Sequence, residues 1–371
     1  MKVFENISLK DYNTFGIDVK ARRLVVLEPG DEVPPLDGEV LILGGGSNMV
    51  FARDFDGTVV TLAHSSDSPR WADSSADFAP LRSQAVCPTE PGRGEEQNGY
   101  GGVCGGGVVC AWGGMVMDDL VQWTLDQGFY GLENLSAIPG TVGASAVQNV
   151  GAYGVEAKDF IEGVEAYDLQ ERRHCRFSNA DCRFAYRWSM FKECPGRYLI
   201  LRVSYRLNRE YNPNLSYKAL EGLPHDTAQR LREAITELRW GKLPRPEENG
   251  SAGSFFKNPV VDEATYLRLR EQYADMPEAH RTPVGGEIQK SNDKDCREAG
   301  SKYKLSAGWL IDRAGWKGCT RGGAGVWPKN ALVLYNAGGC TGEEVVTLAQ
   351  AIQQDVKQKF GVHLEPEAII I

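Results

Sequence analysis

Residues 138–154 read IPGTVGASAVQNVGAYG, and the interpretation of the whole chain starts from this stretch. Four glycines and three alanines alternate there with Thr141, Ser145, Gln148 and Asn149, which leaves few large side chains for a conventional core. Small residues let the backbone approach a flat or charged ligand, while hydroxyl and amide groups offer hydrogen bonds to a phosphate or a heteroaromatic ring. A tightly packed helix crossing is the alternative, but the pattern favours a cofactor-binding segment.

A second glycine-rich segment follows the short apolar run at residues 41–43. Backbone N–H groups on such a turn favour phosphate binding, because no side chain blocks the approach. A Rossmann dinucleotide turn is excluded, since Met49 stands where its third glycine belongs. On its own the segment fits either a nucleotide site or a plain tight turn. It consists of Gly44, Gly45, Gly46, Ser47 and Asn48.

Three further segments carry polar groups in unusual surroundings. Ser254 has neither a G-x-S-x-G context nor a nearby histidine, so it is either a proton donor or an ordinary turn serine, and acyl transfer is not supported. Arg187 lies among the aromatic residues of 184–192, which suits an anionic organic ligand or simple packing of the arginine stem. Glu365 and Glu367 would share one face if this segment is a strand, either as an abnormally titrating pair or as exposed edge charges.

The composition restricts the partners and the compartment. The 371 residues are 42% hydrophobic and 25% charged, with a formal net charge of −9, so no overall basic field attracts nucleic acid or a membrane. Because no signal-peptide pattern or long apolar run is present, we expect a soluble, cytoplasmic protein. Nine cysteines and five histidines lack the spacings of metal sites, so we expect no metal.

Local patterns predict mixed helix and strand structure. Apolar runs predict strands, and cap residues predict three helices, the last opened by a capping box of Thr341 and Glu344. The stretch from about 65 to 108 is rich in Ser, Pro, Gly and acidic residues and predicts a long surface excursion. Strands are expected at 23–27, 39–43, 58–62, 164–167, 198–203 and, at a sheet edge, 368–371; helices are expected from 118 to 128, after 226 or 227, and from 341 to 361.

Taken together, these motifs resemble the UDP-N-acetylenolpyruvoylglucosamine reductases, also called UDP-N-acetylmuramate dehydrogenases. Two features depart from the family pattern: Trp112 replaces a small residue near the expected flavin, and the excursion at 65–108 is unusually long. The matching segments occur in family order and are NTFGI at 13–17, GGGSN at 44–48, GLENL at 131–135, residues 138–154, CRFAYR at 182–187, AGSFFKNP at 252–259, AGWLID at 307–312 and LEPE at 364–367.

The resemblance implies an α+β fold of the vanillyl-alcohol-oxidase (PCMH) flavin type, with two FAD-binding domains and a third α+β domain that binds substrate. The implied domains are residues 1–62, to which 363–371 return, residues 63–242 and residues 243–362. It also implies non-covalent FAD, NADPH as co-substrate and a monomer. Non-covalent binding agrees with the lack of histidine and cysteine in residues 138–154. The expected FAD contacts are Gly44, Gly45, Gly46, Ser47, Asn48, Pro139, Gly140, Gly143, Ala144, Gln148, Asn149, Gly151, Ala152 and Tyr153.

The implied reaction reduces UDP-N-acetylglucosamine enolpyruvate to UDP-N-acetylmuramate in peptidoglycan synthesis. NADPH reduces the flavin and leaves, hydride then passes to the enolpyruvyl group, and a serine protonates the adjacent carbon. By motif position this serine is Ser254, while Arg187 and Glu367 are similar to the pair that polarises the carboxylate. Tyr217, which marks the subclass with a tyrosine loop, Lys242, Asn258 and Asn330 resemble contacts to the substrate diphosphate and sugar.

Two alternatives stay open at this point. The chain is also compatible with a flavin oxidase of the same fold that acts on another alcohol or sugar, although Tyr217, Ser254 and Glu367 argue against it. A non-catalytic nucleotide-sugar binder that has lost flavin because of Trp112 is the other alternative, and a colourless purified protein would favour it.

Overall fold

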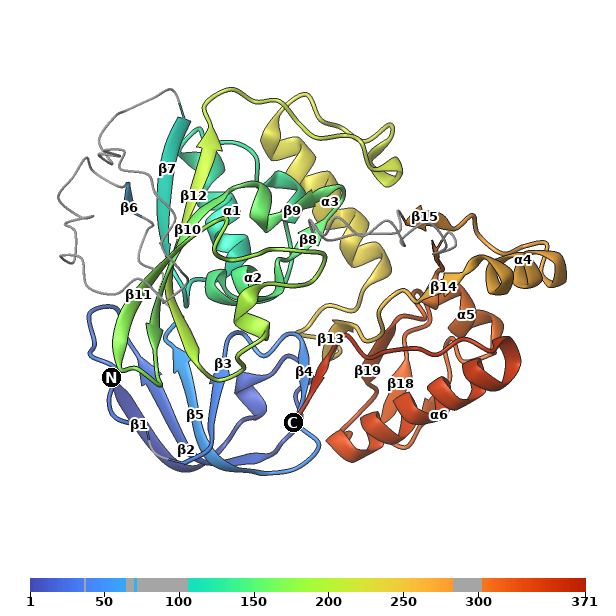
Figure 1. Cartoon of the computed structure of the whole chain (residues 1–371), viewed down its shortest axis with the longest axis horizontal. Coiled ribbons are helices and arrows are strands. Elements are labelled where there is room, and N and C mark those ends of the chain that lie inside the picture. Colours follow the sequence, from blue (N-terminus) through green and yellow to red (C-terminus); the bar gives the residue numbers. More distant parts are fainter. Residues whose placement is uncertain (37, 65–69, 72–105, 283–301) are drawn as a thin grey trace, which may run out of the picture. The chain divides into compact units, whose positions relative to one another are not determined.

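A computed structural model describes residues 1–36, 38–64, 70–71, 106–282 and 302–371 (Figure 1). The described chain divides into two compact units, which we treat separately. Unit 1 comprises residues 1–7, 21–45 and 56–239, and unit 2 comprises residues 8–20, 46–55 and 240–371. Most of the surface excursion predicted at 65–108 lies outside the described residues. Its predicted C-terminal boundary is wrong, because residues 106–108 already form a strand with regular antiparallel pairing. The predicted boundaries of three domains remain a prediction.

The first sheet of unit 1 has the strand order β1-β2-β5-β3. Strands β3 and β5 run parallel, with Leu41 opposite Val59. The predicted strands at 23–27, 39–43 and 58–62 are confirmed, because their aliphatic and β-branched residues fit a pleated, buried surface. The strands are β1 (Lys2–Ser8), β2 (Lys20–Leu27), β3 (Val40–Leu43) and β5 (Phe55–Leu62).

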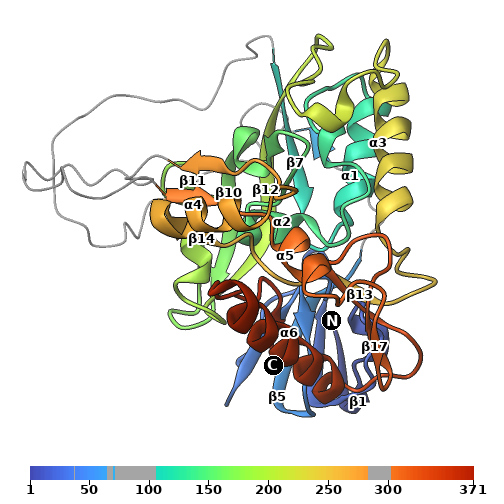
Figure 2. The same cartoon turned by 90° about the vertical axis from the view of Figure 1, so that its right-hand side faces the viewer.

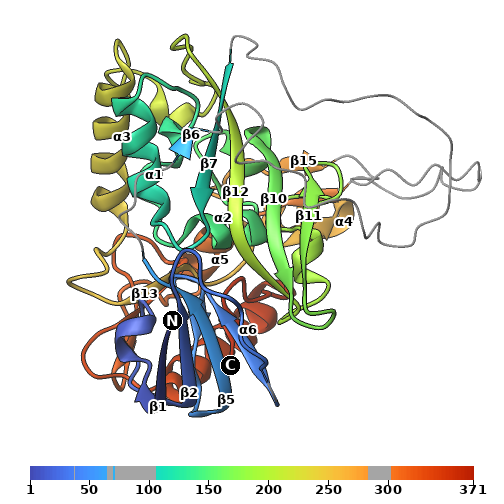
Figure 3. The ribbon, with the colours of Figure 1, turned by 90° about the vertical axis from the view of Figure 1, so that its left-hand side faces the viewer.

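The second sheet of unit 1 has the order β11-β10-β12-β7-β6 and is antiparallel. Helices α1, α2 and α3 lie on one side of it (Figure 3). One apolar core joins α1 and α2 to this sheet through residues such as Leu120, Ala146 and Val203, all fully buried. The elements are β6 (Arg70–Trp71), β7 (Gly106–Trp112), β10 (Ile161–Asp168), β11 (Arg173–Ser178), β12 (Tyr198–Asn208), α1 (Met117–Asp126), α2 (Val142–Gln148) and α3 (Ala228–Lys242).

These elements confirm the predicted strands at 164–167 and 198–203 and the two predicted helices of this unit. Gly128 follows α1 in a left-handed conformation, with φ +70°, as expected for a residue that stops a helix. Shorter elements complete the unit. They are η2 (Glu133–Leu135), β8 (Gly151–Ala152), β9 (Val155–Glu156), η3 (Ala157–Asp159), η4 (Met190–Lys192) and η5 (Lys218–Leu220).

Trp112 lies at the end of β7, in a second apolar cluster of unit 1. Its indole N–H donates to the carbonyl oxygen of Ala63 at 3.1 Å, and its ring packs against a cluster that includes Leu62 and Leu199. Since Leu62 belongs to the first sheet and Leu199 to the second, Trp112 contributes to the packing between the two sheets. The structure therefore gives Trp112 a role in the core of unit 1.

Unit 2 contains a sheet of order β13-β19-β18-β17, with α5 and α6 lying next to one another (Figure 2). The capping box of Thr341 and Glu344 is confirmed at the start of α6, and Gly361 ends the helix with φ +71°. The predicted terminal strand is confirmed as well. It pairs in parallel with β4, Ile369 opposite Met49. The elements are η1 (Lys10–Tyr12), β4 (Met49–Val50), β13 (Ser251–Ser254), α5 (Ala307–Arg313), β17 (Thr320–Arg321), β18 (Ala324–Val326), β19 (Val333–Asn336), α6 (Gly342–Phe360) and β20 (Ile369–Ile370).

A small three-stranded sheet of order β14-β16-β15, accompanied by α4, completes the described part of unit 2. These elements are β14 (Val260–Asp262), α4 (Glu263–Gln272), β15 (His280–Thr282) and β16 (Lys302–Lys304). The sheets and helices of both units confirm the predicted α+β class. Within the described ranges, no helix has the length and apolar character needed to cross a membrane.

Candidate functional site

The two glycine-rich segments predicted to bind a cofactor meet in unit 1. A Cβ atom on Gly44 would lie 2.9 Å from the Cβ of Ala144, and one on Gly45 would lie 3.0 Å from the Cα of Gly140. The two segments therefore pack so closely that neither glycine leaves room for a side chain. Gly44, Gly45, Gly140 and Ala144 are all partly exposed, so main-chain groups are accessible along this contact. Such a surface fits the close approach of a flat, charged cofactor such as FAD.

The remainder of the first glycine segment belongs to unit 2. Gly46 has φ +61°, and a Cβ atom there would lie 2.2 Å from the carbonyl oxygen of Tyr12. The side chain of Asn48 donates to the carbonyl oxygen of Glu367 at 3.3 Å. Packing of the chain thus explains Gly46 and Asn48 locally, and their predicted FAD contacts, like that of Ser47, stay predictions.

Gly143 and Asn149 are buried inside unit 1. A Cβ atom on Gly143 would lie 3.1 Å from the carbonyl oxygen of Gly113, so this glycine lets α2 pack closely beside β7. The Asn149 amide donates to the Glu156 carboxylate at 3.0 Å and to the Ala185 carbonyl at 2.8 Å. Both residues have structural roles here, and direct contact with FAD remains a prediction for each.

Arg187 is attached to the segment that follows α2. Its guanidinium donates to the carbonyl oxygens of Gly151 at 2.6 Å and Asn149 at 3.4 Å. Arg187, Asn149 and Tyr153 have φ angles of +55°, +45° and +49°, a region that residues with side chains adopt at an energetic cost. Backbone strain of this kind concentrates at functional sites, and here it falls on three residues predicted to act there.

Tyr153 lies close to Arg239 and faces Tyr217 edge-on, with 5.6 Å between the ring centroids. Burial raises the pKa of the Tyr153 hydroxyl, although Arg239 acts in the opposite direction. Burial also lowers the pKa of Arg239, which donates to the Ala137 carbonyl as well. Sequence reasoning missed Arg239. The signal was its place on α3, one turn after buried Ile235 on the same helix face.

In unit 2 the structure brings Ser254 and Glu367 onto neighbouring segments. The backbone N–H of Glu367 donates to the carbonyl oxygen of Phe255 at 2.7 Å, and that of Lys257 donates to the carbonyl oxygen of Glu365 at 2.9 Å. Ser254 ends β13 beside Gly253, which has φ +67°. Glu365 is exposed and lies 3.6 Å from the Lys257 ammonium, while Glu367 is only partly exposed. The two predicted catalytic residues of this unit are therefore neighbours.

The other predicted substrate contacts lie on short turns and at a helix end. Asn258 accepts a hydrogen bond from the Ala307 amide at 3.0 Å, at the start of α5. Asn330 accepts from the Leu332 amide at 3.1 Å, in the turn before β19. Lys242 is exposed at the last residue of α3. The backbone around each is defined, and their predicted roles remain predictions.

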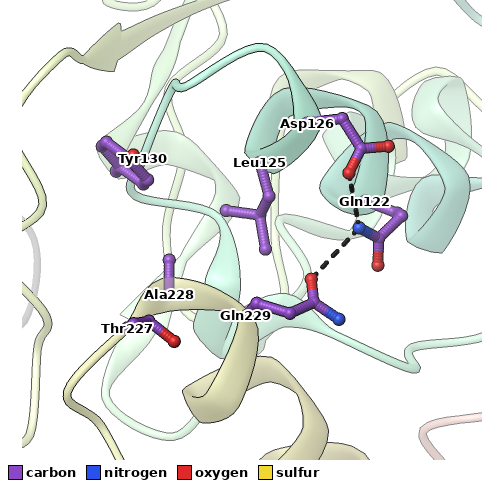
Figure 4. A pocket seen from close by; sticks show the side chains of 7 residues that line it. All are labelled: Gln122, Leu125, Asp126, Tyr130, Thr227, Ala228 and Gln229. Carbon is purple, nitrogen blue, oxygen red and sulfur yellow. Dashed lines mark hydrogen bonds between the residues drawn. The ribbon is translucent and has the colours of Figure 1, made fainter.

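A cavity of about 350 Å³ lies between α1 and α3 in unit 1 (Figure 4). The side-chain amide of Gln122 donates hydrogen bonds to the Asp126 carboxylate at 2.9 Å and to the side-chain oxygen of Gln229 at 3.1 Å, and so links α1 to α3 at this cavity. None of the residues predicted to bind FAD or substrate lines it. Its lining residues are Gln122, Leu125, Asp126, Tyr130, Thr227, Ala228 and Gln229. In the part of the chain that the structure describes, no three His, Cys, Asp or Glu side chains are arranged to hold a metal ion.

Comparisons with known proteins cover the whole chain. Residues 245–371 match the family described as UDP-N-acetylenolpyruvoylglucosamine reductase, C-terminal domain, and residues 97–173 match the FAD binding domain family. The UDP-N-acetylenolpyruvoylglucosamine reductase of Pseudomonas aeruginosa is 41% identical over 99% of this chain and 98% of its own length. The UDP-N-acetylenolpyruvoylglucosamine reductase of Pseudomonas putida is 42% identical over 98% of this chain and 97% of its own length.

A solved structure supports the same fold. The UDP-N-acetylenolpyruvylglucosamine reductase of Thermus caldophilus superposes with a TM-score of 0.60 at 21% identity, covering 100% of this chain and 99% of that one. This likeness, together with the match of residues 97–173 to the FAD binding domain family, confirms the predicted FAD-binding fold. High identity over nearly full length in both Pseudomonas reductases shows the family. The chain therefore belongs to the UDP-N-acetylenolpyruvoylglucosamine reductase family and is an FAD-dependent oxidoreductase.

Proposed function

We propose that the chain reduces UDP-N-acetylglucosamine enolpyruvate to UDP-N-acetylmuramate for peptidoglycan synthesis, with NADPH as the electron donor. Its relatives carry the name of this reductase over nearly their full length. The observation that carries the mechanism is the 2.7 Å hydrogen bond from the Glu367 backbone N–H to the carbonyl oxygen of Phe255, since Phe255 directly follows Ser254 and the bond brings the two segments together. A hydroxyl and a carboxylate on neighbouring segments suit a reaction in which a proton is added to a carbon–carbon double bond.

When bound, FAD would supply the hydride-transfer chemistry that links NADPH to the substrate. In unit 1, the accessible main chain of Gly45, Pro139 and Gly140 is suited to hold it without covalent attachment. Gln148, at the end of α2, is partly exposed and would offer an amide. Acid precipitation is expected to release the yellow colour into the supernatant, and colour kept in the pellet would contradict non-covalent binding.

Ser254 supplies the proton. Reduction of the double bond adds hydride to one carbon and a proton to the other, and the second carbon becomes strongly basic as the first bond forms. A hydroxyl is a weak acid, so it acts only on such a basic centre and with charges nearby. We assign Arg187 to the substrate carboxylate, which its planar guanidinium matches in geometry. We assign Glu367, together with Arg187, to the polarisation of this substrate carboxylate.

The remaining contacts bind the nucleotide part of the substrate. Tyr217 is 49% exposed, and we place the chain in the subclass with a tyrosine loop. Lys242 offers an exposed ammonium for the diphosphate. Asn258 and Asn330 offer amides on ordered turns for the sugar and diphosphate. Cytoplasmic location and a monomeric state are part of the same proposal.

The test separates the two half-reactions in Ser254→Ala. Bleaching of the flavin by NADPH should be nearly unchanged, while reoxidation by the enolpyruvyl substrate should slow by about 10² to 10⁴-fold, the usual contribution of a general acid. Ser251→Ala, on the same strand, is the matched control and should leave both rates unchanged. Equal losses in both half-reactions would make Ser254 a structural residue. Rapid oxygen consumption with another alcohol would favour the oxidase alternative.

A further inference from the structure

A set of side-chain hydrogen bonds ties residues 185–192 to the end of α2. The hydroxyl of Ser189 donates to the carbonyl oxygen of Val147 at 2.6 Å, and the Asn149 amide donates to that of Ala185 at 2.8 Å. Both Ser189 and Asn149 are completely buried. These contacts hold a turn that carries Arg187 against a helix end that carries Gln148.

Lys192 makes the third connection, and it differs from the other two. Its ammonium donates to the side-chain oxygen of Gln148 at 2.5 Å and to the backbone carbonyl of Arg187 at 3.0 Å. One ammonium thus joins a predicted FAD contact to a predicted catalytic residue. Lysine suits this place because its three N–H donors serve separate acceptors that lie in different directions.

We infer that Lys192 is a positioning residue that couples the Gln148 amide to the backbone of Arg187. This inference rests on the proposed function, which assigns Gln148 to FAD and Arg187 to the substrate. Lys192 acts through these two residues and needs no contact with either ligand. It belongs to the same network as Ser189 and Asn149, and among these three residues it is the one that carries a charge.

The backbone of Arg187 explains why a charged donor is needed. With φ +55°, Arg187 occupies a region that is costly for a residue with a side chain, so its conformation persists only when neighbouring contacts hold it. The guanidinium is held by Gly151 and the carbonyl oxygen by Lys192. Loss of the ammonium removes the second of these contacts and also the hydrogen bond to the side-chain oxygen of Gln148. Charged hydrogen bonds are stronger than neutral ones, so the loss should be measurable.

Lys192→Met keeps most of the side-chain volume and removes the charge. We expect FAD to bind about tenfold more weakly in a fluorescence titration of the apoprotein, as for loss of one charged hydrogen bond. Reoxidation by the enolpyruvyl substrate should slow by about tenfold or more, while bleaching by NADPH at saturating FAD changes less. Lys192→Arg retains charge and donors and should recover most of both losses.

Lys359→Met is the matched control. Lys359 also donates to a carbonyl oxygen, that of Ala314, at 2.6 Å and pairs with Asp355 at 2.9 Å, but it lies on α6 in unit 2. This control measures how far the loss of a hydrogen-bonded lysine elsewhere in the fold lowers folding stability and, through it, FAD affinity. FAD affinity should stay within about twofold of the original protein in Lys359→Met, and an equal weakening in both variants would overturn the inference.

A double-mutant cycle tests the coupling itself. If Lys192 acts on FAD through Gln148, Gln148→Leu and Lys192→Met should weaken FAD binding non-additively, so the double variant is little worse than either single one. Additive losses would overturn the coupling. Hydrogen exchange of residues 185–191 in the apoprotein gives a readout that needs neither FAD nor substrate. Faster exchange in Lys192→Met supports the inference even if the proposed substrate fails to turn over, and unchanged exchange with unchanged FAD affinity would overturn it.

Discussion

The guanidinium of Arg187 donates a 2.6 Å hydrogen bond to the carbonyl oxygen of Gly151. Gly151 lies two residues beyond the left-handed Asn149 and two before the left-handed Tyr153, so the contact holds Arg187 against a strained segment of backbone. A guanidinium that is held by a carbonyl keeps its remaining donors in a defined orientation. Such preorganisation reduces the reorganisation needed when an anion binds.

Arg187→Lys is expected to test this arrangement. Lysine keeps the charge but loses the planar fork, so it cannot hold Gly151 and a carboxylate at once in the same geometry. Reoxidation of the flavin by the enolpyruvyl substrate should slow by about 10² to 10³-fold, as for loss of a preorganised donor, with FAD content unchanged. Arg183→Lys is the control: Arg183 has φ +46° on the same turn but forms an exposed ion pair with Glu193. Similar losses in both variants would argue against a specific role for Arg187.

Lys242→Ala should affect capture of the substrate more than the chemical steps. If the exposed ammonium binds the diphosphate, its removal raises KM with little change in kcat and makes binding less sensitive to salt. Steady-state kinetics at two ionic strengths measure both effects. An unchanged KM would place the diphosphate site on other residues.

Gly46→Ala should destabilise the fold through both a steric clash and an unfavourable φ angle. Gly128→Ala, which has only the unfavourable φ angle, separates these two effects. At Gly46 the new Cβ would lie 2.2 Å from the carbonyl oxygen of Tyr12, and φ is +61°. Gly128 has a similar φ of +70° but no heavy atom within 4 Å of an added Cβ. Gly128→Ala should therefore cost about 1 to 2 kcal/mol, and Gly46→Ala at least about 3 kcal/mol, because it adds a steric clash to the backbone penalty. Urea unfolding measures both, and equal losses would contradict the predicted clash.

Asp168 should make stability depend on pH in the acid range. Burial acts to raise its pKa, but the hydrogen bond from Arg197 and two backbone N–H groups outweigh burial and hold the pKa below its ordinary value. A carboxyl with a lowered pKa stabilises the fold fully above its unfolded pKa of about 3.9, and this contribution is lost as pH falls through the folded value. Asp168→Asn should cost about 1.5 to 3 kcal/mol at pH 7, the usual value for hydrogen bonds to a charged group.

The difference in unfolding free energy between Asp168→Asn and the original protein should shrink as the pH falls below about 4. Urea unfolding at pH 7, 5 and 3 checks this, with Asp56→Asn as the control, since Asp56 is 94% exposed beside Arg22. A difference that stays constant with pH would show that the Asp168 charge contributes nothing.

Local elements were predictable because their signals lie close together in the chain. The capping box of Thr341 and Glu344 and the stop at Gly361 define α6 without reference to the rest of the fold. The aliphatic run at 39–43 defines β3 in the same way. The glycine-rich segments and Ser254 were recognisable as motifs for the same reason, since each motif is a short, contiguous pattern.

The pairing of distant segments was decided only by tertiary structure. Nothing within residues 254–257 indicates that their backbone pairs with residues 365–367, because the hydrogen bonds joining them depend on how the chain returns to the same place. The contact of Gly45 with Gly140 has the same origin. The double attachment of Lys192 also depends on the packing of the turn at 185–192 against α2. The sequence by itself indicated which residues are candidates for the chemistry, and tertiary structure determined which of them hold one another in place, because those interactions join residues far apart in the chain.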